Sequence, residues 1–120
     1  MDTSATEKIR IFDPEKMEWE RLVSDHNGKE LFDKKMVIDP ETGMVVNFSY
    51  YPAGYMTEWH THQCSHGIYV IKGTLKTSAG DVPEGGFAWF PEGTAMEHGA
   101  GDEGVYVLFF TNKPFRIAYL

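Results

Sequence analysis

The sequence predicts a small all-β chain of antiparallel strands, folded as a sandwich or a barrel. Turn signals rich in glycine, proline and asparagine recur roughly every five to twelve residues. The runs between them are short and rich in β-branched and aromatic residues, and they show no helical periodicity. The chain has 120 residues, of which 42% are hydrophobic, and this suffices for one core. We therefore expect one domain over residues 1–120.

Little regular structure is expected at the N-terminus. Residues 1–8 are small and polar, and we predict that they are flexible. A first short strand is predicted at residues 9–12. Asp13 and Pro14 are typical of a helix start, but little apolar periodicity follows, so a single turn is expected. Residues 19–23 are a weaker strand prediction.

The strand pattern is clearer in the rest of the chain. A hairpin loop with Pro40 and Gly43 separates two of the predicted strands. The strand at 105–111 is apolar on both faces, which indicates that both faces are covered, one of them by another subunit. In order, the predicted strands are 31–38, 44–51, 55–62, 67–71, 74–77, 87–90, 105–111 and 115–120.

Charge and cysteine content exclude several classes of partner and location. The net charge is −7, with acidic residues scattered along the chain. Nucleic acids and anionic membranes require basic patches, so neither is expected as a partner. Cys64 is the single cysteine, which rules out an intrachain disulfide. Because the sequence also contains neither an apolar signal core nor a membrane-length apolar run, we expect a soluble, cytoplasmic protein.

Four of the five histidines point to a metal site. His60, His62 and His66 crowd into seven residues, and His98 lies in a second segment rich in glycine and proline. Side chains two residues apart on a strand share a face, so His60 and His62 can bind one ion. Imidazole is the commonest protein ligand for transition metals near neutral pH. We predict that all four side chains bind one divalent transition metal.

At this point the sequence resembles the cupin superfamily. The first cupin motif is glycine, five residues, His-x-His, three or four residues, glutamate, six residues and glycine. The chain matches it from Gly54 through His60 and His62 to Gly73, with His66 at the position where glutamate is commoner. The resemblance implies a double-stranded β-helix, the jelly-roll barrel of cupins.

The second cupin motif is matched less closely. It reads glycine, five residues, Pro-x-Gly, two residues and histidine. Gly85, Pro91 and Gly93 are in place, but His98 comes two residues late and Met96 occupies the usual position. An inserted pair of residues after the turn would restore the ligand. The two motifs together span residues 54–98.

The resemblance also implies a metal and a chemistry. Histidine in place of glutamate is similar to small cupins with four-histidine sites, in which the metal is Mn, Fe, Ni or Zn. Four neutral imidazoles leave the full charge on the ion, which favours anionic, chelating small-molecule substrates. The leading hypothesis is an enzyme with an oxygenase-type reaction, oxidative C–C cleavage, and an isomerase or lyase is the alternative. A non-catalytic metal- or metabolite-binding module and a structural zinc site are the other hypotheses.

Residues near the four predicted ligands have expected roles of their own. Glu58 shares the face of His60 and is the predicted proton carrier, although it could also be a solvated charge at the rim. Glu97 has the opposite parity to His98 and is expected to be exposed. Cys64 and His26 are expected to take no part. Cupins generally pair through apolar sheets, so the resemblance implies a homodimer.

Overall fold

The computed structural model describes residues 8–120. Within this range the chain forms one short 3-10 helix, η1 (Pro14–Lys16), and eleven strands. The strands are β1 (Glu20–Val23), β2 (Glu30–Ile38), β3 (Val45–Tyr51), β4 (His60–His62), β5 (His66–Lys72), β6 (Leu75–Thr77), β7 (Gly80–Val82), β8 (Phe87–Phe90), β9 (His98–Ala100), β10 (Val105–Thr111) and β11 (Ile117–Tyr119). The predicted all-β class is confirmed. Over the same range no helix has the length and apolarity needed to cross a membrane.

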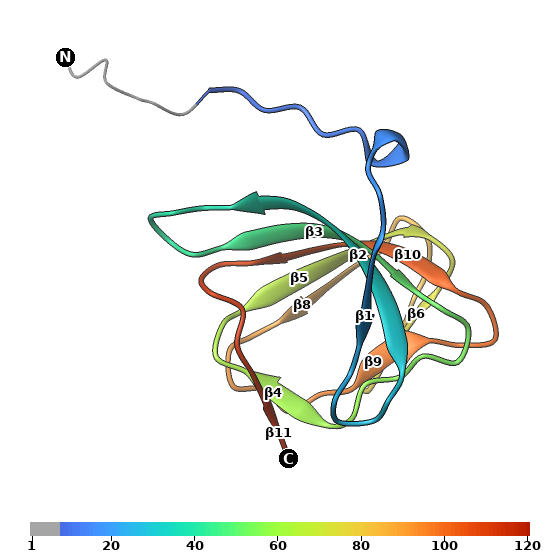
Figure 1. Cartoon of the computed structure of the whole chain (residues 1–120). Helices are drawn as coiled ribbons and strands as arrows, with labels where there is room; N and C mark the ends of the chain where they lie inside the picture. Colours follow the sequence, from blue (N-terminus) through green and yellow to red (C-terminus); the bar gives the residue numbers. More distant parts are fainter. Residues whose placement is uncertain (1–7) are drawn as a thin grey trace.

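The strands close into a barrel. Six of them form the largest sheet, in the order β1-β2-β3-β10-β5-β8, and two smaller sheets have the orders β7-β6-β9 and β11-β4. Every pairing between these strands is antiparallel. Figure 1 shows the small sheets facing the large one across the interior. This arrangement confirms the predicted jelly-roll barrel.

The core is built from the inner face of the large sheet. Side chains of β10 alternate between buried and partly exposed, and Val105, Val107 and Phe109 point inward. The neighbouring β5 adds Ile68 and Val70 to the same cluster. Alternation of this kind follows from the strand period of two. Each buried aliphatic side chain contributes roughly 1.5–3 kcal/mol to folding.

The N-terminal segment differs from the prediction in one respect. Asp13 caps η1 as expected, because its carboxylate accepts from the backbone N–H of Glu15 at 3.0 Å. The strand predicted at residues 9–12 is wrong: Ile9 and Ile11 are 95% and 91% exposed, and the segment forms an extended arm outside the barrel (Figure 1). The predicted flexible terminus, residues 1–8, lies outside the described residues apart from Lys8.

Candidate metal centre

The strand β4 carries two of the predicted ligands. His60 and His62 are buried, with Thr61 between them less so. One edge of the strand pairs with β11, where His62 lies opposite Ile117. On the other side, backbone hydrogen bonds join His60 and Met96 in both directions at 2.9 Å. Held in this way, the two imidazoles project into the barrel, as period-two alternation predicts.

The strand β9 brings His98 to the same place from a distant part of the chain. Thr57 anchors it twice, since its N–H donates to the carbonyl oxygen of His98 and its Oγ1 accepts from the N–H of His98, both at 3.0 Å. At Gly99 an added Cβ would overlap the carbonyl oxygen of Tyr55, so only glycine allows this close approach. The two extra residues after Gly93 therefore do not remove His98 from the interior.

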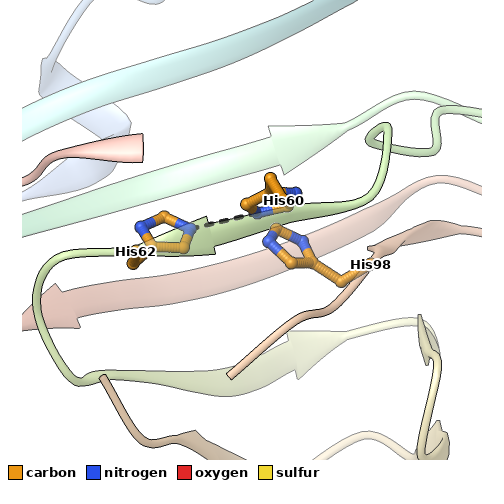
Figure 2. A group of neighbouring side chains, drawn as sticks. All are labelled: His60, His62 and His98. Atoms are coloured by element: carbon orange, nitrogen blue, oxygen red, sulfur yellow. Dashed lines mark hydrogen bonds between the residues drawn. The ribbon is translucent and has the colours of Figure 1, made fainter. Parts of the chain in front are cut away.

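Three imidazoles meet inside the barrel. One ring nitrogen from each of His60, His62 and His98 lies within 4.8 Å of the other two, and Figure 2 shows the rings turned toward one another. The Nε2 atoms of His60 and His62 are 3.1 Å apart. Nδ1 of His60 is 2.6 Å from the backbone carbonyl oxygen of Glu58, to which it donates. That bond leaves the lone pair of the His60 Nε2 facing the cluster.

The surroundings keep these rings neutral. Burial, and then the neighbouring His60, lower the pKa of His62 to about 4. Burial also lowers the pKa of His60, and burial together with the other histidines holds the pKa of His98 well below 6.5. In the described chain, Nδ1 of His62 and Nδ1 of His98 have no hydrogen-bond partner. Neutral imidazoles with unused lone pairs are what a transition metal binds, so these three residues fit such an ion.

His66 lies beside the three-histidine cluster. It is fully buried on β5, its ring stacks on Phe90 at 4.6 Å, and its ring centre is 4.2 Å from that of His62. It is not among the three residues whose ligand atoms lie within 4.8 Å of one another. Neither ring nitrogen of His66 has a hydrogen-bond partner in the described residues, and burial lowers its pKa to about 3. The fourth ligand therefore remains a prediction.

The histidine cluster lines a cavity of about 750 Å³. Sites for small molecules typically measure 300–1,000 Å³, so the space suits a substrate of that class. Part of the wall is aromatic, with Phe109, Phe115 and Tyr119. Another part is polar and comes from the inner faces of β2 and β3. Its residues are Asp33, Asn47 and Ser49.

The remaining predicted residues have different environments. Glu58 is exposed and its side chain does not line the cavity; its backbone carbonyl is what contacts His60. Its role as proton carrier stays a prediction. Cys64 is buried, and burial raises the pKa of its thiol. His26 does line the cavity, although it is exposed, and its ring stacks on Tyr119 at 4.1 Å.

The buried carboxyl of Asp33 is a residue that the sequence reasoning missed. Only 7% of Asp33 is exposed, and Ser49 Oγ donates to its Oδ1 at 2.6 Å. Burial raises the pKa of this carboxyl, and the hydrogen bond from Ser49 opposes that rise. The sequence does contain a signal for it. Asp33 lies two residues after Leu31 in a predicted strand, so the two side chains share one face of that strand.

Comparisons with known proteins agree on the fold. The profile of a family described as ChrR cupin-like domain matches residues 7–116. No curated protein sequence matches the chain.

Solved structures of similar fold share little sequence with the chain. A protein from Methylibium petroleiphilum, provisionally described as an acetylacetone dioxygenase, aligns with a TM-score of 0.79 and 14% identity over 96% of this chain and 84% of that one. The polyketide cyclase RemF from Streptomyces resistomycificus aligns with a TM-score of 0.78 and 18% identity over 94% and 86%. A mutant of Bacillus subtilis oxalate decarboxylase aligns with a TM-score of 0.66 and 21% identity over 91% and 32%.

Proposed function

The chain belongs to the ChrR cupin-like domain family, and from this premise we propose that it is a metal-dependent enzyme acting on a small chelating molecule. One observation carries the proposal. Three buried, neutral imidazoles converge on the wall of a cavity of about 750 Å³. Two of the three rings, His62 and His98, each have a buried nitrogen without a hydrogen-bond partner in the described chain, and such an atom costs about 1–3 kcal/mol.

His60, His62 and His98 would hold the metal, with His66 as the proposed fourth ligand. A divalent ion bound by uncharged imidazoles acts as a Lewis acid on chelating oxygen atoms. The protein supplies the rest of the site. The backbone oxygen of Glu58 fixes the tautomer of His60, and Phe109, Phe115 and Tyr119 give the cavity an aromatic wall.

An oxygenase-type reaction, oxidative C–C cleavage, is the chemistry we propose first. Support comes from the all-imidazole ligand set and from the likeness to the fold provisionally described as an acetylacetone dioxygenase. A lyase or isomerase is the alternative, and the likeness to oxalate decarboxylase favours keeping it.

The test separates metal binding from turnover. Chelator-treated protein is loaded in parallel with Mn²⁺, Fe²⁺, Ni²⁺ or Zn²⁺, and the metal per chain is measured by mass spectrometry. Oxygen uptake and product formation are then followed with acetylacetone, longer 1,3-diketones and catechol. We expect about one metal per chain, and turnover with at least one metal that disappears in His60→Ala.

Two results would count against the proposal. Failure of the wild-type chain to retain any of the four metals would remove the basis of the metal site. Stoichiometric metal without turnover of any probe, but with probe-induced stabilisation, would favour the non-catalytic binding module.

A further inference from the structure

The cavity has a second polar group that the histidines do not explain. Asp33 on β2 and Ser49 on β3 are paired across the two strands and both line the cavity. Asp33 is 7% exposed and Ser49 is 3% exposed. A carboxyl inside a barrel is unusual, because removing a carboxylate from water costs several kcal/mol unless it is paired.

The partners of Asp33 are too few to explain its burial. Within residues 8–120, the side-chain hydroxyl of Ser49 is its hydrogen-bond donor, at 2.6 Å from Oδ1, and Oδ2 has none. Among these residues it forms no ion pair. The charge of Lys35 opposes the rise in the pKa of Asp33, but the Lys35 ammonium pairs with Glu20, at 3.4 Å. One carboxylate oxygen is thus held by the protein and the other is left for a ligand.

The surroundings of Asp33 link it to the metal cluster. Tyr51 and Tyr55 are buried, line the same cavity and lie with their ring centres 5.2 Å apart. The ring centre of Tyr51 is 5.8 Å from that of His98. Burial raises the pKa of Tyr55 to about 12, and the charges of Tyr119 and Asp33 add to the rise, so its hydroxyl stays a neutral donor. Ser49, which holds Asp33, and Tyr51 share the inner face of β3, so polar groups line the cavity between Asp33 and His98.

We propose that Asp33, oriented by Ser49, binds a hydrogen-bond-donor group of the substrate at the end away from the histidines. The inference rests on the proposed function and narrows its substrate class. The substrate then carries metal-chelating oxygen atoms at one end and a hydroxyl or ammonium group at the other. Asp33 acts in binding and selectivity, while the metal site depends on the histidines alone.

Matched hydroxamates test this inference. Each probe has a hydroxamate at one end to chelate the bound metal, a chain of two to five carbons, and a terminal methyl, hydroxyl or ammonium group. Dissociation constants are measured by calorimetry on metal-loaded protein, and metal content is measured in parallel. At one chain length we expect the hydroxyl or ammonium probe to bind about tenfold more tightly than its methyl analogue.

Variants assign that preference to Asp33. Asp33→Asn should abolish most of it without lowering the metal content, and Ser49→Ala should reduce it by a smaller factor. Asp102→Asn is the control, because it makes the same chemical change at an exposed aspartate outside the cavity. It should keep the full preference. The hydroxyl and ammonium arms show which donor the site selects.

Each other outcome has a definite meaning. Equal binding of all three terminal groups at every chain length, with metal bound, would overturn the inference and leave the proposed function intact. Retention of the preference in Asp33→Asn, or loss of metal from that variant, would also overturn it. Wild-type protein that binds no metal would overturn the proposed function and the inference together.

Discussion

Buried imidazoles without hydrogen-bond partners are the residue-scale feature that sets this chain apart. Four ring nitrogens are in this state in the described chain, one each on His62 and His98 and both on His66. Each destabilises the metal-free fold by about 1–3 kcal/mol. Each imidazole gives one nitrogen to a single ion, so a bound cation can satisfy at most one of these nitrogens per ring. Metal binding should therefore stabilise the folded chain.

His66 is the residue at which this coupling is most informative. His66→Phe keeps a ring stacked on Phe90 but removes both unpaired nitrogens. We expect the metal-free variant to be more stable than wild type by about 1–2 kcal/mol. If His66 is the fourth ligand, metal affinity should fall by roughly 10–100-fold. Urea denaturation of chelator-treated protein and metal competition titrations measure the two effects.

His26→Phe is the matched control for this experiment. The same chemical change is made at a histidine that stacks on Tyr119 and is absent from the cluster. His26→Phe should change neither the stability of the metal-free protein nor the metal affinity by a comparable amount. Unchanged metal affinity in His66→Phe would mean that the site uses three histidines.

The lowered pKa values of the buried histidines predict how stability depends on pH. The pKa is about 4 for His62 and about 3 for His66 in the folded chain, against 6.5 ordinarily. Below pH 6.5 the unfolded chain therefore binds more protons than the folded one, and stability falls as pH decreases. Above pH 7 both states are neutral and the effect vanishes.

We expect metal-free protein to lose on the order of a few kcal/mol between pH 7 and pH 4.5. Urea denaturation at intervals of half a pH unit measures this slope. The change in stability between pH 6.5 and pH 5.5 reports most specifically on the histidines, because carboxyl groups ordinarily titrate at lower pH. His66→Phe should flatten the curve, and a flat curve for the wild type would contradict the neutral, buried state of these rings.

At the scale of elements, the close approach of β9 to the segment before β4 decides where His98 lies. Gly99→Ala places a methyl group against the backbone of Tyr55 and 2.8 Å from Met56 Cα, and neither can move cheaply. We expect a loss of about 1–3 kcal/mol in stability. We also expect at least a tenfold loss in metal affinity, because β9 must shift and carry His98 with it.

Thermal melts and metal titrations measure both losses, and Gly101→Ala is the control. Its added methyl group meets only the flexible end of the Lys76 side chain, at 2.8 Å from Cε. Gly101→Ala should leave the stability and the metal affinity close to those of the wild type. Equal metal affinity in the two variants would show that His98 does not depend on this approach.

Most strands could be predicted because their sequence patterns are local. The runs that became β8 and β10 were predicted with the same ends, since turn residues bound each run of apolar side chains. The segment 55–62 became a regular strand only at His60–His62, because its first half makes a single bridge, from Met56 to Gly99, and bends at Trp59. Such a contact depends on residues more than 40 positions away.

The histidines could be predicted as a group, but the polar wall could not. A bulge in β2 is the physical reason. Lys35 pairs with Asn47 and Val37 with Val46, so Met36 is an extra residue between them. If this bulge is ignored, strict alternation from the inward-facing Ile38 places Asp33 on the outer face of the sheet.

At the scale of the whole molecule, β3 departs from the usual pattern of a half-buried strand, although the inner faces of β5 and β10 in the same sheet are apolar. On β3 the inner face carries Asn47 and Ser49, whereas the outer face carries Val46, Phe48 and Tyr50. A polar interior suits a ligand cavity, and an apolar exterior needs a cover. Part of that cover is intramolecular, because Trp19 packs against an outer aromatic group. Its members are Phe32, Phe48, Tyr50 and Tyr106.

The other half of the outer face is uncovered within the described chain. Tyr69 and Ile71 on β5 and Phe87 and Trp89 on β8 are exposed there. The homodimer predicted from the sequence stays a prediction, and this patch is where we expect the second copy to pack. Burying several aromatic side chains on the face of a sheet is typical of stable homodimers.

Light scattering after size-exclusion chromatography tests this expectation. The wild type should have a mass twice that of the 13.6 kDa chain at micromolar concentration. Trp89→Lys places a charge in the patch and should shift the mass to that of a monomer, because an unpaired charge cannot be buried cheaply at an interface. Phe115→Lys changes an aromatic residue of similar exposure, 47% against 51%, that lies outside the large sheet and lines the histidine cavity instead. It should remain dimeric, and a monomeric wild type, or dissociation of both variants alike, would exclude this face as the interface.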